Sequence, residues 1–106
     1  MASLQNITEL AERIVREFHP ERIILFGSSA VGVAKEDSDV DLLVIMPTGG
    51  SGLRKAAESL NKKGPRIPVD LIVRDPDDVR RRLEFNDFFL REVFEKGQLL
   101  YESAPE

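Results

Sequence analysis

The fold is decided by two stretches, Ile-Ile-Leu-Phe-Gly-Ser at residues 23–28 and Ser-Asp-Val-Asp-Leu-Leu-Val-Ile at residues 38–45. Each contains an apolar run rich in branched residues, which predicts a buried strand. The first run ends at a Gly-Ser pair, whose small side chains let the backbone come close to phosphate oxygens. The second begins with Asp39 and Asp41, and alternation along a strand places both carboxylates on one face.

A third apolar run, residues 67–73, also carries an aspartate, Asp70. An acid inside an apolar strand costs free energy unless it is paired or bound to a metal ion. If this strand neighbours the second one, Asp70 joins Asp39 and Asp41. Carboxylate oxygens of this kind suit hard divalent cations such as magnesium. The alternative for Asp70 is a buried acid paired with Arg66 or Arg74.

Ten residues separate Gly27-Ser28 from Asp39-Val40-Asp41, and this spacing resembles the signature of the nucleotidyltransferase superfamily. The small size resembles its minimal nucleotidyltransferase (MNT) branch, whose members are often antitoxins of HEPN-domain toxins. The resemblance implies that Asp39, Asp41 and Asp70 are catalytic ligands of two Mg²⁺ ions, with Asp70 also a candidate general base. It implies nucleotide binding by Gly27, Ser28 and Ser29, with ATP as substrate. Val31 stands where relatives often carry arginine.

The rest of the chain indicates helices around a sheet. Apolar spacing predicts helices over residues 4–18 and 53–60. Ser3 or Asn6 can cap the first helix, and Asn6-x-x-Glu9 resembles a capping box. Asp75-Pro76 predicts another helix start, and residues 98–101 predict an edge strand. Asn86 is expected to separate that helix from the last one. Phe85, Phe88, Phe89 and Val93 recur at helical spacing, which predicts a buried phenylalanine cluster, with a groove for a partner as the alternative. We expect a single α+β domain over residues 1–106, a mixed sheet covered by helices, as in the nucleotidyltransferase fold.

Composition narrows the functional classes. The chain has 106 residues, a net charge of −4 and no cysteine, so disulfides and thiolate metal sites are excluded. Because the net charge is negative, we do not expect direct binding to nucleic acid. The sequence lacks an apolar run long enough to span a membrane. We expect a cytoplasmic protein. The basic runs at residues 62–63 and 80–82 are interpreted as solvated helix faces.

The expected function is Mg²⁺-dependent transfer of AMP from ATP to a hydroxyl, as the resemblance implies, on the tyrosine of a HEPN toxin. A small domain has little material for a substrate-binding module, so the acceptor is expected to arrive on a separate protein. Two alternatives stay open. The chain could neutralise a toxin by contact alone, or it could modify a small molecule.

Overall fold

The computed structural model describes residues 4–27, 40–47 and 69–103. Within these ranges the elements are α1 (Leu4–Phe18), β1 (Arg22–Phe26), β2 (Val40–Ile45), β3 (Val69–Arg74), α3 (Pro76–Glu84), α4 (Phe88–Lys96) and β4 (Gln98–Glu102). The predicted helix at residues 53–60 lies outside the described residues.

The described strands form one sheet in the order β3-β2-β1-β4. Strand β1 pairs antiparallel with β2 and with β4, while β2 and β3 run parallel. The sheet is therefore mixed, as expected. The apolar run of β2 places this strand in the interior of the sheet, and the predicted edge strand is β4.

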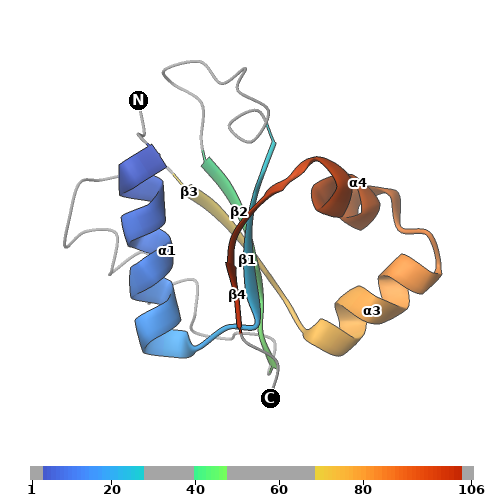
Figure 1. The fold of residues 1–106 in the computed structure, drawn as a ribbon. Coiled ribbons are helices and arrows are strands. Elements are labelled where there is room, and N and C mark those ends of the chain that lie inside the picture. Colours follow the sequence, from blue (N-terminus) through green and yellow to red (C-terminus); the bar gives the residue numbers. More distant parts are fainter. Residues whose placement is uncertain (1–3, 28–39, 48–68, 104–106) are drawn as a thin grey trace.

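Helix α1 covers one face of the sheet, and α3 and α4 cover the other (Figure 1). The first layer packs α1 residues such as Ile14 against Leu25, Leu42 and Leu71. The second layer joins Ile24 and Leu43 to Val79, Leu90 and Val93. Because side chains alternate along a strand, β1, β2 and β3 divide their residues between these two layers.

The helix ends follow the local sequence. Asp75 caps α3, where its side chain accepts a hydrogen bond from the Asp77 amide at 2.9 Å, and Pro76 occupies the first turn. Asp87 caps α4 by accepting from the Leu90 amide at 2.9 Å. Helix α1 ends at Phe18, before His19 with φ of 51° and the buried Pro20. Asn6 lies inside α1, so the predicted capping role of Asn6 is wrong.

The predicted phenylalanine core is also wrong. Phe85 and Phe88 are each 80% exposed, and Phe89 is 42% exposed. The spacing misleads because no single helix spans the four residues. The chain leaves α3 at Phe85 and turns through Asn86, with φ of 59°, before α4 begins. That turn resets the helical phase, so α4 buries Leu90 beside Val93, the one predicted member of the cluster that is buried.

Candidate active site

Two carboxylates meet on adjacent strands. In the parallel pair of β2 and β3, Asp41 is the register partner of Asp70. Val40 and Leu42 belong to the core layer beneath α1, so Asp41 between them faces the side of α3 and α4. Asp70 alternates in the same way with Leu71, so both side chains project from the same face.

The two acids differ in their surroundings. Asp41 is half-buried on the interior strand, whereas Asp70 is exposed near the start of β3. The alternative for Asp70, a buried acid paired with an arginine, is therefore wrong about burial. The side chain is exposed because β3 lies at the margin of the described sheet. Arg74 donates from Nη1 to the Val73 carbonyl at 3.0 Å, and Arg66 lies outside the described residues.

Gly27 brings the backbone against Asp41. It ends β1 with φ of 79°, a left-handed conformation that glycine adopts without steric cost. A Cβ at this position would overlap a carboxylate oxygen of Asp41 and lie 3.3 Å from its Cγ. Phe26, the preceding residue, is the register partner of Asp41 across β1 and β2. The turn thus needs glycine for its conformation and for the room that Asp41 occupies.

Three of the predicted site residues, Ser28, Ser29 and Asp39, lie outside the described residues. Within the described ranges, no three His, Cys, Asp or Glu side chains gather as a metal-binding group. Asp41 and Asp70 nevertheless offer oxygen donors from one face of neighbouring strands, and such donors fit a hard divalent cation. The alternation that places Asp39 on the face of Asp41 remains a prediction from sequence.

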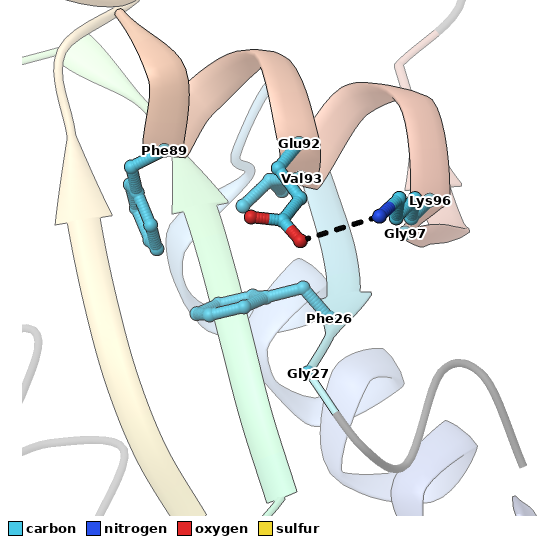
Figure 2. A pocket seen from close by; sticks show the side chains of 7 residues that line it. All are labelled: Phe26, Gly27, Phe89, Glu92, Val93, Lys96 and Gly97. Atoms are coloured by element: carbon cyan, nitrogen blue, oxygen red, sulfur yellow. Dashed lines mark ion pairs between the residues drawn. The ribbon is translucent and has the colours of Figure 1, made fainter. Parts of the chain in front are cut away.

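An aromatic pair borders the carboxylates. The rings of Phe26 and Phe89 meet edge to face, with centroids 5.5 Å apart and planes at 84° (Figure 2). Phe89 reaches from α4 toward the end of β1. Sequence reasoning assigned Phe89 to the core and gave Phe26 no role. The available signal was the position of Phe26 directly before Gly27, which alternation places on the face of Asp41.

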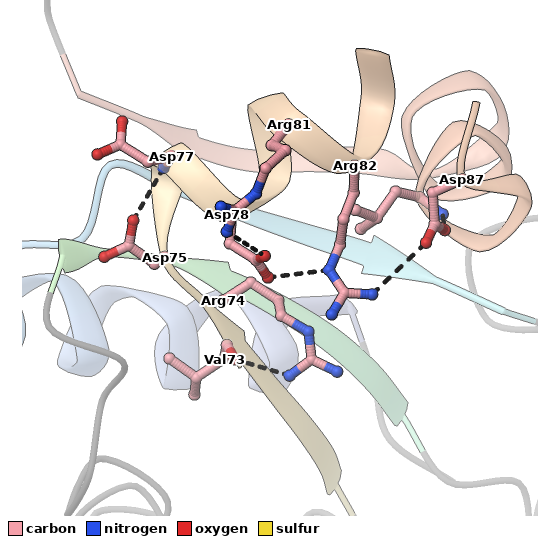
Figure 3. Close-up of polar contacts among 9 residues, drawn as sticks. Val73, Arg74, Asp75, Asp77, Asp78, Arg81, Arg82 and Asp87 are labelled. Atoms are coloured by element: carbon pink, nitrogen blue, oxygen red, sulfur yellow. Dashed lines mark hydrogen bonds and ion pairs between the residues drawn. The ribbon is translucent and has the colours of Figure 1, made fainter. Parts of the chain in front are cut away.

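The three arginines of α3 form ion pairs with aspartates of the same surface. Arg81 and Arg82 contact Asp78 at 3.2 and 3.0 Å, and Arg82 also reaches Asp87 at 3.6 Å (Figure 3). Arg80 lies 3.6 Å from Asp77. The hydrogen bond from Arg81, together with Arg82, lowers the pKa of Asp78 below its ordinary value. These contacts agree with a solvated helix face for residues 80–82.

Comparison with known proteins gives a family-level match. A nucleotidyltransferase domain model matches residues 7–100, which is most of the chain. No curated protein matches the sequence significantly. In the part of the chain that the structure describes, no helix is long and apolar enough to cross a bilayer.

Solved structures resemble the fold at low sequence identity. A toxin–antitoxin crystal structure with AMP-PNP has a TM-score of 0.63 at 21% identity, covering 92% of this chain and 74% of that one. A mutant toxin–antitoxin structure, MntA–HpeT, gives 0.62 at 17% identity with the same coverage. A candidate nucleotidyltransferase from Sulfolobus solfataricus gives 0.54 at 23% identity, covering 91% and 77%. At these identities the likeness shows the fold alone.

Proposed function

The chain belongs to the nucleotidyltransferase domain family, and from that premise we propose that it is a protein adenylyltransferase that silences a partner toxin. The observation that carries the proposal is the register of Asp41 with Asp70 beside Gly27. This arrangement combines two oxygen ligands and a close approach of backbone in one place, as transfer from a metal-bound triphosphate requires.

In the proposed reaction, an acceptor hydroxyl oxygen attacks the α-phosphorus of ATP. The bond from that phosphorus to the bridging oxygen breaks, and pyrophosphate leaves with its electron pair. Asp39, Asp41 and Asp70 would hold Mg²⁺, which neutralises charge on the phosphates and orients the attacking and leaving oxygens. Asp70 is exposed at the margin of the site, a suitable position for accepting the hydroxyl proton of an incoming substrate.

The Gly27 turn is assigned to the triphosphate. Its backbone has no side chain to keep phosphate oxygens away, and because it lies against Asp41, a phosphate held there would be beside the proposed metal ligand. Ser28 and Ser29, which follow directly in the sequence, would add hydroxyl and amide donors.

The proposed acceptor is a tyrosine of a HEPN-domain toxin, reached in a complex of the two proteins. Support comes from the resemblance of the Gly-Ser and Asp-x-Asp spacing to MNT antitoxins, and from the fold shared with toxin–antitoxin structures. The family generally uses nucleoside triphosphates with a divalent metal ion, and Mg²⁺ and ATP are the proposed members of those classes here.

A second candidate, neutralisation by contact alone, is favoured by the exposed aromatic residues Phe85 and Phe88, which suit a protein interface. Buried carboxylates without a role would repel one another and argue against this candidate, but Asp70 is exposed and Asp41 is only half-buried.

Growth of cells that express the toxin separates the two candidates. The double variant Asp39→Ala/Asp41→Ala should bind the toxin in pull-down experiments and fail to restore growth. If the variant binds the toxin and still restores growth, contact is sufficient and the enzymatic proposal is wrong.

A further inference from the structure

A pocket of about 320 Å³ opens between the end of β1 and the inner side of α4 (Figure 2). Its walls include Phe26, Phe89 and Val93, and Gly27 lies at the end nearest the carboxylates. This volume is at the lower end of the range of roughly 300–1,000 Å³ for small-molecule sites. The pocket can therefore take part of a nucleotide rather than a whole coenzyme.

The apolar wall of the pocket is aromatic and accessible. Val93 is only 3% exposed and forms a fixed surface, whereas Phe89 keeps 42% of its surface exposed although it contacts Phe26. Flat bases stack on aromatic side chains of this kind without needing a particular hydrogen-bond pattern. A two-ring purine covers more of such a wall than a one-ring pyrimidine.

The polar rim of the pocket is an ion pair on successive turns of α4. Lys96 Nζ lies 3.5 Å from Glu92 Oε1, and both side chains are about half exposed or more. An exposed pair contributes little to stability, so a ligand can take over either partner at small cost. Together the two side chains offer donors and an acceptor to the edge of a base.

Gly27 connects this pocket to the carboxylates. The same residue lines the pocket and contacts the carboxylate of Asp41, and Phe26 is the register partner of Asp41. A molecule seated against the Phe26–Phe89 pair can therefore extend past Gly27 toward Asp41. A nucleoside triphosphate has this layout, with an aromatic base at one end and metal-binding phosphates at the other.

We propose that the pocket between Phe26, Phe89 and the Glu92–Lys96 pair binds the purine nucleoside half of the triphosphate donor. The proposal rests on the proposed function and extends it to the selection of the donor. Affinity at the Gly27 end depends on phosphate and metal alone, whereas affinity at the α4 end depends on the base.

Calorimetric titration of the full chain with Mg²⁺ and either ATP, CTP or inorganic tripolyphosphate tests the assignment. We expect ATP to bind at least about 10-fold more tightly than the other two, in keeping with the stacking of one base. Phe89→Leu keeps an apolar side chain against Phe26 and removes the ring. It should weaken ATP binding about 5- to 10-fold and leave tripolyphosphate binding unchanged.

Phe88→Leu is the matched control, because Phe88 precedes Phe89 on the same helix, is 80% exposed and does not line this pocket. It should leave both affinities unchanged. Equal binding of ATP, CTP and tripolyphosphate, with no effect of Phe89→Leu, would overturn the nucleoside assignment while transfer of AMP could still be measured. If Phe89→Leu instead raises only the KM for the acceptor protein, the pocket holds the acceptor, and the inference is wrong.

Absence of binding for all three phosphates, together with absence of transfer, would remove the proposed function and this inference with it. Retention of tripolyphosphate binding by Phe89→Leu shows that the variant is folded. Glu92→Gln provides a second test at the rim of the pocket. It should change the ratio of ATP to GTP affinity without changing tripolyphosphate affinity.

Discussion

Asp41 and Asp70 are register partners across the parallel strands β2 and β3, and both side chains leave the sheet on the side of α3 and α4. The two residues are far apart in sequence and come together only through the pairing of their strands. Their proximity makes charge the main quantity to test, because two neighbouring carboxylates repel each other unless a cation lies between them.

Neutralising either acid should lower the transfer activity without lowering the stability of the fold. Asp41→Asn and Asp70→Asn keep the size of the side chain and remove its charge. Each should lower AMP transfer by at least about 100-fold if the lost ligand costs metal affinity and positioning. Each should leave the metal-free Tm unchanged or slightly raised, because one source of repulsion is gone. Transfer rates and thermal unfolding check these outcomes.

Asp77→Asn is the matched control for the two acids. Asp77 is an aspartate of α3 whose side chain is 87% exposed and forms an ion pair with Arg80 at 3.6 Å. It should keep full transfer activity and nearly unchanged Tm, because an exposed ion pair contributes about 0–1 kcal/mol. Comparable losses in Asp77→Asn and Asp70→Asn would mean that the loss reflects net charge rather than the site.

Gly27→Ala should damage both conformation and site. The residue has φ of 79°, where a side chain is strained by about 1–2 kcal/mol, and its Cβ would overlap the Asp41 carboxylate. We expect lower free energy of unfolding in urea and at least a 10-fold loss of Mg²⁺-dependent ATP affinity. The affinity loss follows because Asp41 must move to admit the methyl group.

Asn86→Ala isolates the conformational part of that effect. Asn86 also has a positive φ, 59°, and lies in the turn between α3 and α4, away from the pair of carboxylates. It should lose stability by a similar amount and keep ATP affinity. If Asn86→Ala lowers affinity as much as Gly27→Ala does, backbone strain alone explains the loss and the contact with Asp41 is irrelevant.

The local pattern of apolar residues was sufficient to predict where the strands lie. The apolar run of β2 indicated a buried strand, and the apolar run at residues 67–73 indicated the strand β3 that carries Asp70. The register of Asp41 with Asp70 could not be predicted, because strand order depends on contacts between distant segments. The contact between Gly27 and Asp41 could not be predicted from the sequence for the same reason.

The phenylalanine cluster shows a different limit. Helical spacing predicts burial only while one helix continues, and the left-handed residue Asn86 interrupts it between Phe85 and Phe88. An Asn-Asp pair in that position was a signal for a turn and a new cap. All three phenylalanines were consequently assigned to a core that contains none of them.

The difference in burial between Phe88 and Leu90 on α4 can be tested by measuring the stability of variants. Phe88→Ala should change the free energy of unfolding by no more than about 0.5 kcal/mol, because its side chain is already solvated. Leu90→Ala, at a site only 2% exposed, should cost about 2–5 kcal/mol. Urea unfolding measures both values. A large loss for Phe88→Ala would show that the residue is buried in solution, against the present structure.

The cluster of Asp78 with Arg81 and Arg82 predicts a pH dependence. The pKa of Asp78 is lowered in the folded state, chiefly by the hydrogen bond from Arg81. Its stabilising contribution is therefore complete above the ordinary aspartate pKa and is lost as pH falls through the lower, folded-state value. The Tm difference between wild type and Asp78→Asn should be positive at pH 7 and vanish in strong acid. A difference that grows on acidification would contradict this assignment.

The most direct test of the account is the intact mass of the proposed HEPN-domain partner, co-purified with this chain, after incubation with ATP and Mg²⁺. Wild type should add one or more AMP units to that protein, and Asp41→Asn and Asp70→Asn should add none while still forming the complex. A complex whose partner gains no AMP from wild type, or gains it equally from Asp41→Asn, would contradict the claim that the paired carboxylates catalyse nucleotidyl transfer.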